Sequence, residues 1–227
     1  MNRPPDFNRL APLYQWMEFL TFGPWLSLTR FTFVSHITRS RRALVLGDGD
    51  GRFAVRLLRA NPTFLVDAVE ASSAMLQMLL RRAAPHTDRL RVHLADARDW
   101  QPSTLGPGPC CDLIATHFFL DCLTQAEVES LARRLRSAVS PSALWVVSEF
   151  AIPATWFGRL IARPVVAILY ESFGLLTGLT VRSLPDHACA LRLAGFDLQE
   201  RRTRLAGLLI AELWCAGPAL IPAEAAS

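Results

Sequence analysis

The chain has 227 residues, of which 51% are hydrophobic and 19% are charged, and its formal net charge is +4. This length suits one generous α/β domain, and the composition excludes disorder over most of the chain. The basic residues are scattered among carboxylates rather than gathered in the runs that mark a nucleic-acid arm, so we expect no nucleic-acid partner.

The N-terminal segment contains two apolar patterns with helical spacing. They cover residues 7–20 and 25–37, and Gly23 and Pro24 separate them. We therefore expect a helical cap or extension over residues 1–40. A main domain over residues 41–217 and a disordered tail over residues 218–227 complete the expected division of the chain.

Strand-like and helical runs alternate after residue 41. The β-type runs are residues 43–47, 64–70, 90–95, 111–118 and 143–150, and helical runs at 52–60, 74–83 and 125–138 lie between them. This rhythm predicts a parallel sheet with helices on both faces. An apolar helix over residues 156–176, a short helix between Pro185 and Gly195, and β-type runs at 196–202 and 208–215 follow, which gives seven strands in an α/β fold.

Targeting and metal-binding signals are missing from the sequence. The first residues lack the apolar run and cleavage site of a secretory signal. Arg159, Arg163 and Glu171 interrupt the most apolar stretch, so no membrane-spanning helix is expected. The five cysteines show no Cys-x-x-Cys spacing and no histidines at metal-ligand intervals. We therefore expect a cytoplasmic protein with no bound metal.

A glycine-rich turn joins the first predicted strand to the following helix. Gly47, Gly49 and Gly51 allow a tight turn and a close approach to a nucleotide-type ligand. Arg52 stands where a dinucleotide fingerprint needs its third glycine, which disfavours NAD. The intervening aspartates, Asp48 and Asp50, would repel a pyrophosphate and suit a ligand with a sulfonium and an ammonium. For Asp50, a helix cap and a ligand contact both stay open.

Two further acids follow strands of the predicted sheet. Glu70 ends the second strand nineteen residues after Gly51, close to the spacing at which an acid accepts hydrogen bonds from ribose hydroxyls. Asp96 follows the third strand and could accept a hydrogen bond from an adenine amino group. Both acids are expected at the carboxyl edge of the sheet, where ligands bind in such folds.

The segments VLGDGDG, VEASSAML, ADARDW and CDLIATHFFLDCL resemble class I S-adenosylmethionine-dependent methyltransferases over about residues 41–150. The resemblance implies a Rossmann-like fold with an antiparallel seventh strand, for which residues 208–215 are the candidate. It also implies S-adenosyl-L-methionine as cofactor. The cofactor-binding residues it implies are Gly47, Asp48, Gly49, Gly51, Glu70, Ala71, Met75, Asp96 and Ala97. Val45 replaces an acid that is frequent in the family, and Asp48 is expected to compensate.

The opening FNRLAPLYQWMEF is similar to the start of quinone-biosynthesis methyltransferases, where Phe7, Ala11 and Tyr14 match and Gln15 departs. In that family this pattern begins a helix that closes over the cofactor. Our candidate acceptor-binding residues are Tyr14 in this segment, Phe118 after the fourth strand and Tyr170 in the apolar helix.

An in-line transfer from an activated methyl donor needs mainly orientation and exclusion of water. An acceptor that must lose a proton also needs a base, and His117 and Asp121 follow the fourth strand. For His117, packing among aromatic residues is an equal alternative. We expect a small lipophilic or aromatic acceptor and transient contact with a membrane surface. The alternatives are a scaffold that binds the cofactor or an adenine nucleoside, and an NAD-dependent oxidoreductase.

Overall fold

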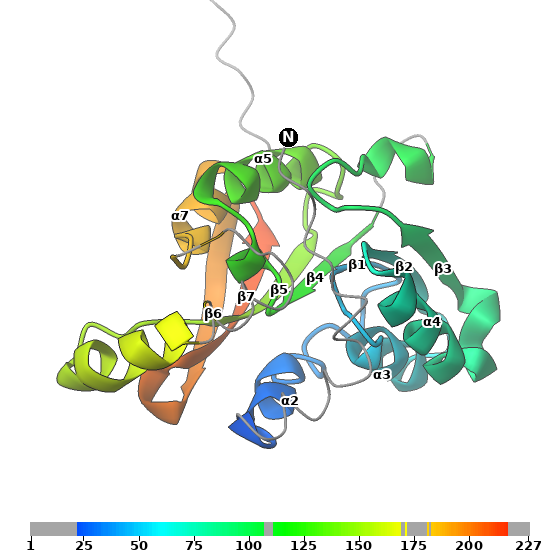
Figure 1. Cartoon of the computed structure of the whole chain (residues 1–227). Coiled ribbons are helices and arrows are strands. Elements are labelled where there is room, and N and C mark those ends of the chain that lie inside the picture. The colour runs from blue at the N-terminus through cyan, green and yellow to red at the C-terminus, as the bar shows by residue number, and fades with distance from the viewer. Residues whose placement is uncertain (1–21, 107–110, 169–170, 172–180, 182, 218–227) are drawn as a thin grey trace, which may run out of the picture.

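A computed structural model describes residues 22–106, 111–168, 171, 181 and 183–217. It contains one seven-stranded sheet with the strand order β3-β2-β1-β4-β5-β7-β6 (Figure 1). The strands are β1 (Arg42–Leu46), β2 (Leu65–Glu70), β3 (Leu90–Leu94), β4 (Leu113–His117), β5 (Leu144–Phe150), β6 (Phe196–Arg204) and β7 (Leu209–Ala216). Strands β1 to β5 run parallel, whereas β7 pairs antiparallel with both β5 and β6. The predicted seven-stranded, mostly parallel sheet is confirmed.

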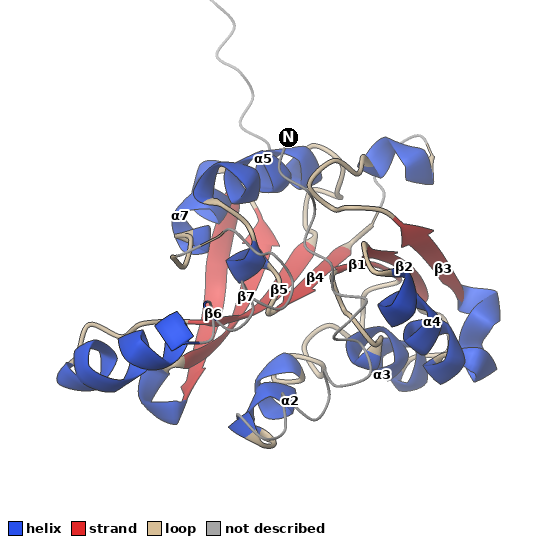
Figure 2. Ribbon diagram, viewed as in Figure 1, coloured by secondary structure: helices blue, strands red, loops and turns tan. Residues whose placement is uncertain are grey.

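Helices cover both faces of this sheet (Figure 2). On one face, α3 (Arg52–Ala60) and α4 (Ser73–Arg82) bury Phe53, Leu57 and Leu79 against the strands. On the other face, α5 (Gln125–Arg136) and α7 (His187–Leu193) bury a second apolar cluster. Thr124 and Glu127 form a reciprocal capping box that fixes where α5 begins. The core therefore lies in two layers, one on each side of the sheet.

The N-terminal helix is shorter than predicted. Helix α2 spans Trp25–Arg30, and turns replace the helix expected over residues 31–37. The turns place the side chains of Phe33 and Ile37 in the core. The hydroxyls of Thr29 and Thr32 also bond to carbonyls four residues earlier, a local contact that favours the end of a helix. The helix expected over residues 7–20 lies outside the described residues, as does the tail from residue 218.

The apolar segment after β5 is helical over residues 156–168, with a π-helical turn at Gly158–Ala162. Most of the rest of this predicted helix lies outside the described residues. No helix in the described part of the chain is both long and apolar enough to span a bilayer.

Gly51→Ala is expected to lower the free energy of unfolding by about 2–4 kcal/mol, because it combines backbone strain with a steric collision. Gly51 has φ +81°, and a Cβ there would lie 2.5 Å from Cγ and 2.9 Å from Cα of Leu79. Urea denaturation measures the loss. Gly195→Ala is the matched control, since Gly195 has φ +89° but its nearest contact would be Nε of Arg136 at 3.6 Å. Equal losses in the two variants would show that Leu79 is not the cause.

Candidate cofactor and acceptor site

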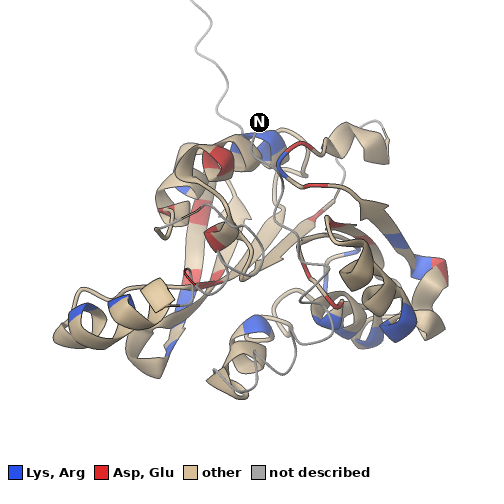
Figure 3. Ribbon diagram, in the orientation of Figure 1, with Lys and Arg blue, Asp and Glu red and all other residues tan. Residues whose placement is uncertain are grey.

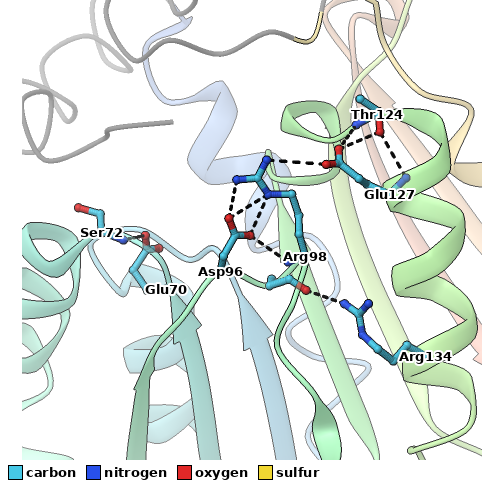
Figure 4. Close-up of polar contacts among 8 residues, drawn as sticks. Glu70, Ser72, Asp96, Arg98, Thr124, Glu127 and Arg134 are labelled. Carbon is cyan, nitrogen blue, oxygen red and sulfur yellow. Dashed lines mark hydrogen bonds and ion pairs between the residues drawn. The ribbon is translucent and has the colours of Figure 1, made fainter. Parts of the chain in front are cut away.

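Four polar or glycine-rich segments meet at the carboxyl edge of the sheet. The glycine turn follows β1, Glu70 ends β2, Asp96 follows β3, and a short 3-10 turn at Leu120–Cys122 follows β4. Figure 4 shows the side chain of Glu70 at the end of β2 and that of Asp96 just after the neighbouring strand β3. The parallel order of the strands brings these segments to one edge, as the sequence predicted.

Glu70 links the glycine turn to the start of α4. Its side chain is buried, with 8% of the residue exposed. The backbone N–H of Gly49 donates to Oε2 over 3.1 Å, and the N–H of Ser72 donates to Oε1 over 2.8 Å. Burial raises the pKa of Glu70 to about 7, although both amide hydrogen bonds oppose this shift. A carboxylate has about four acceptor positions, so the amides do not use all of its capacity to accept from a ligand hydroxyl.

The glycine turn is packed between the loop after β4 and helix α4. Gly47 has φ +63°, and a Cβ there would collide with the ring of Phe119. Gly49 has φ +62°, and a Cβ there would lie 3.9 Å from Sδ of Met75. The collision with Phe119 requires glycine at position 47, whereas at position 49 only the left-handed backbone favours it.

Asp48 caps α3. The amides of Phe53 and Ala54 donate to its two carboxylate oxygens over 3.2 and 2.8 Å. Burial raises the pKa of Asp48 to about 6, against the opposing effects of the Ala54 amide and the charge of Arg30. The cap is the role that the structure gives to Asp48, and its proposed compensation for Val45 stays a prediction.

Asp50 forms ion pairs with two arginines. Nε of Arg52 lies 3.0 Å from Oδ2, and Nη2 of Arg82 lies 2.7 Å from the same oxygen. Gly51 occupies the cap position of α3, so the interpretation of Asp50 as a helix cap is wrong. Because two guanidinium groups match its charge, Asp50 adds less negative charge to the turn than the sequence suggested.

Two arginines hold the turn after β3, as Figure 4 shows. Arg98 donates to Asp96 from Nε over 2.9–3.0 Å, and its Nη1 lies 3.7 Å from Oε1 of Glu127. Arg134 donates to the carbonyl of Ala97 over 2.6 Å. Burial alone would raise the pKa of Asp96, but the hydrogen bonds from Arg98 outweigh it and lower the pKa. Neither arginine was predicted from the sequence, although the position of Arg98 two residues after Asp96 is a visible signal.

Arg98→Ala is expected to weaken the binding of the cofactor that the sequence resemblance implies, S-adenosylmethionine, about three- to tenfold, because Asp96 loses the group that orients it. Calorimetric titration measures the change. Arg133→Ala is the control, since Arg133 pairs with Glu129 on the exposed surface of α5. Unchanged affinity in Arg98→Ala would mean that Asp96 needs no such support or does not contact the cofactor.

Glu149 holds the loop after β4. Its Oε1 accepts hydrogen bonds from the amides of Phe119 and Leu120 over 3.1 and 2.8 Å. The loop begins at Phe118, whose φ of +53° is unusual for a residue other than glycine. Burial and the charge of Asp121 raise the pKa of Glu149 well above its ordinary value. Glu149 therefore fixes the conformation of this loop.

Asp121 lies in the 3-10 turn that follows, and its side chain is partly exposed. Sγ of Cys122 donates to its Oδ1 over 3.5 Å. Burial raises the pKa of Asp121 to about 6, against the opposing effects of Cys122 and His187. A carboxyl group with this pKa can exchange a proton near neutral pH, as an acid–base catalyst must.

His117 packs beneath the edge, between the sheet and the helices α2 and α3. Its ring lies 4.2 Å from that of Phe53, and only 4% of the residue is exposed. Nδ1 lies 2.9 Å from Oγ of Ser148, and that hydroxyl donates to the carbonyl of Thr29 over 3.3 Å. Burial, with a smaller effect of Arg30, lowers the pKa of His117 well below 6.5. Of the two interpretations left open for His117, the structure favours packing.

Aromatic side chains gather beside the loop after β4. The ring of Phe150 lies 5.3 Å from that of Phe118 and 5.2 Å from that of Phe22. The guanidinium of Arg30 lies 5.7 Å from the ring of Phe118. The sequence predicted Phe118 as an acceptor contact and missed Phe22 and Phe150.

Four residues predicted to contact the cofactor or the acceptor remain, and the structure describes two of them. Ala71 is exposed just after β2, and Met75 is buried in α4 near Gly49. Tyr14 and Tyr170 lie outside the described residues. Among the described residues, no group of three or more His, Cys, Asp or Glu side chains could hold a metal ion.

Comparison with known proteins agrees with this geometry. Residues 43–142 match a family model described as a methyltransferase domain. An O-methyltransferase family protein from Burkholderia thailandensis has a similar structure, with 14% identity, a TM-score of 0.68, and coverage of 92% of this chain and 58% of that chain. The S-adenosylmethionine-dependent methyltransferase SibL has 22% identity, a TM-score of 0.64, and coverage of 96% and 63%. The N-methyltransferase NodS from Bradyrhizobium japonicum has 10% identity, a TM-score of 0.59, and coverage of 85% and 97%. No curated protein sequence matches the chain significantly.

The strand order, the antiparallel β7 and the glycine turn after β1 define the fold of class I methyltransferases. The family model described as a methyltransferase domain matches residues 43–142, and the neighbour SibL is an S-adenosylmethionine-dependent methyltransferase. The chain spans only 58% and 63% of the first two structures named above, so its own activity is treated as a proposal.

Proposed function

We propose that this chain is an S-adenosylmethionine-dependent methyltransferase that acts on a small lipophilic or aromatic acceptor. The observation that carries the proposal is the position of Glu70, which is buried at the sheet edge and tied to the glycine turn through Gly49. The cofactor would be held by the turn from Gly47 to Gly51, by Glu70, and by the segment of Asp96 and Ala97. It would supply a methyl group already activated by the positive charge on sulfur.

The electrostatics of this edge favour a cationic ligand over a dinucleotide. Burial raises the pKa of Asp48, Glu70 and Glu149, so their charged forms are costly in the ligand-free protein. A sulfonium and an ammonium nearby would offset that cost, whereas a pyrophosphate would increase it. This argument supports S-adenosylmethionine over NAD.

The surroundings of the loop after β4 support an apolar acceptor. Phe22, Phe118 and Phe150 form a connected aromatic group there. Aromatic side chains at the mouth of a site suit a flat, apolar substrate such as a phenol or quinol. Tyr14 and Tyr170 remain proposed acceptor contacts, and residues 1–40 remain a proposed helical cap. We further propose a cytoplasmic setting with transient contact to a membrane surface.

Methyl transfer requires the protein to align the donor with the acceptor and, for some acceptors, to remove a proton. The methyl group must lie in line between the departing sulfur and the acceptor atom, with water excluded. For a phenolic acceptor, the carboxylate of Asp121 is the proposed proton acceptor. His117 is the weaker candidate because its ring is packed against Phe53.

Calorimetric titration with S-adenosylmethionine, S-adenosylhomocysteine and NAD tests the cofactor, and transfer of a labelled methyl group to a panel of lipophilic phenols and quinols tests the reaction. We expect both adenosyl ligands to bind and at least one acceptor to be methylated. Binding of NAD alone would contradict the proposal and favour an oxidoreductase. Cofactor binding without transfer to any oxygen, nitrogen or carbon acceptor would favour the scaffold alternative.

A further inference from the structure

Within the described part of the chain, the helix over residues 156–168 has its buried side chains on one side. Ala162 and Val166, four residues apart, are buried together with Leu208. At Gly158 a Cβ would collide with the carbonyl oxygen of Pro153, so the helix backbone lies directly against the segment that follows β5. These contacts fix the orientation of the helix, which extends from the lower left of the molecule in Figure 1.

The opposite side of this helix is apolar and exposed. Trp156, Leu160 and Ile168 are 67%, 71% and 65% exposed, and Ile161 is exposed as well. Together with Ile152, they make up five of the eleven exposed large hydrophobic side chains among the described residues. A surface helix normally turns its polar side to water, so this concentration of apolar side chains indicates an interaction surface.

The charge on this helix is exclusively positive. Arg159 and Arg163 are both exposed, and residues 156–168 contain no Asp or Glu. In Figure 3 the ribbon of this helix carries blue segments and no red ones. Exposed apolar side chains flanked by arginines fit the boundary between lipid headgroups and acyl chains. There Trp and Leu bury apolar surface, and arginine reaches the phosphates.

We propose that the helix over residues 156–168 lies on an anionic bilayer surface and docks the protein there. A second copy of the chain is a poorer occupant, because two-fold packing of this helix on itself would bring four arginines together without a carboxylate from either helix. The inference deepens the membrane contact that is part of the proposed function and rests on it, since a lipophilic acceptor would be drawn from the same membrane.

Sedimentation of the full chain with lipid vesicles tests this docking. One set of vesicles is phosphatidylcholine with about 30% phosphatidylserine, and the other is phosphatidylcholine alone. We expect binding to the anionic vesicles to be at least tenfold stronger and to weaken as salt is added. Leu160→Glu and the double variant Arg159→Gln with Arg163→Gln should each lose most of this binding. Leu193→Glu is the matched control, because Leu193 on α7 is 68% exposed and lies outside the helix.

Equal binding to both kinds of vesicle, or equal binding by all variants, would overturn the inference. A concentration-dependent dimer without lipid that Leu160→Glu abolishes in analytical ultracentrifugation would also overturn it, in favour of a second copy. Calorimetry of S-adenosylmethionine binding to both helix variants without vesicles separates this inference from the proposed function, because that affinity should not change. If Leu160→Glu fails to fold, the double variant Arg159→Gln with Arg163→Gln still tests the docking, because it retains the apolar side chains.

Discussion

Asp121→Asn is expected to lower the rate of methyl transfer to a phenolic acceptor at pH 7 by about 100-fold. The carboxylate lies in the loop after β4, and burial raises its pKa to about 6, so most of it is ionised at pH 7 and able to take a proton. Asparagine has a similar shape but cannot act as the base. Steady-state kinetics with saturating S-adenosylmethionine measure the loss, and cofactor affinity should change little.

The pH profile supplies a second measurement for Asp121. Because the base must be ionised, the wild-type rate should rise as the pH increases through about 6 and then level off, and Asp121→Asn should lack this rise. His117→Gln is the comparison, since we expect it to reduce the free energy of unfolding rather than the rate. An unchanged rate in Asp121→Asn would contradict this role of Asp121, and a loss of the pH limb in His117→Gln alone would assign the base to His117 instead.

Glu70→Ala is expected to weaken the binding of S-adenosylmethionine by about 30- to 100-fold, measured by calorimetry. The substitution removes the acceptor for the proposed ribose hydroxyls and also the group that holds the amides of Gly49 and Ser72 in place. Asp88→Ala is the control, because the carboxylate of Asp88 is exposed and remote from the glycine turn in sequence. Thermal unfolding of both variants checks that the fold is retained.

The affinity of the wild-type protein should also depend on pH. Burial raises the pKa of Glu70 to about 7, so below that pH the side chain is largely protonated in the ligand-free protein. Hydroxyl donors and a cationic ligand favour the ionised form, and the binding of S-adenosylmethionine should therefore release a proton. Affinity should rise as the pH increases to about 7 and be nearly constant above it. A flat profile in the wild-type protein would place the cofactor away from Glu70.

The sequence predicted the sheet well because its signals are local. Short apolar runs separated by helical patterns located all seven strands, and the glycine turn located the start of α3. The helix over residues 25–37 was predicted too long because apolar residues continue past Arg30. Some of those residues, such as Phe33 and Ile37, are buried although they lie in turns. The spacing of apolar residues alone cannot distinguish a buried turn from a buried helix.

The site was less predictable because its decisive contacts join distant residues. Arg82 pairs with Asp50 from 32 residues away, and Glu149 binds amides 30 and 29 residues earlier. The burial of His117 could have been deduced, since alternation along β4 places it on the same face as Leu113 and Ala115, which face the cluster that contains Phe53.

The contact between Gly47 and the ring of Phe119 connects the proposed cofactor site to the proposed acceptor site. One residue belongs to the turn proposed to hold the cofactor, and the other belongs to the loop proposed to meet the acceptor. A shift of the ring when an acceptor binds would be transmitted directly to the backbone of the turn. The two ligands should therefore bind with a shared coupling free energy, so that each changes the affinity of the other by the same factor.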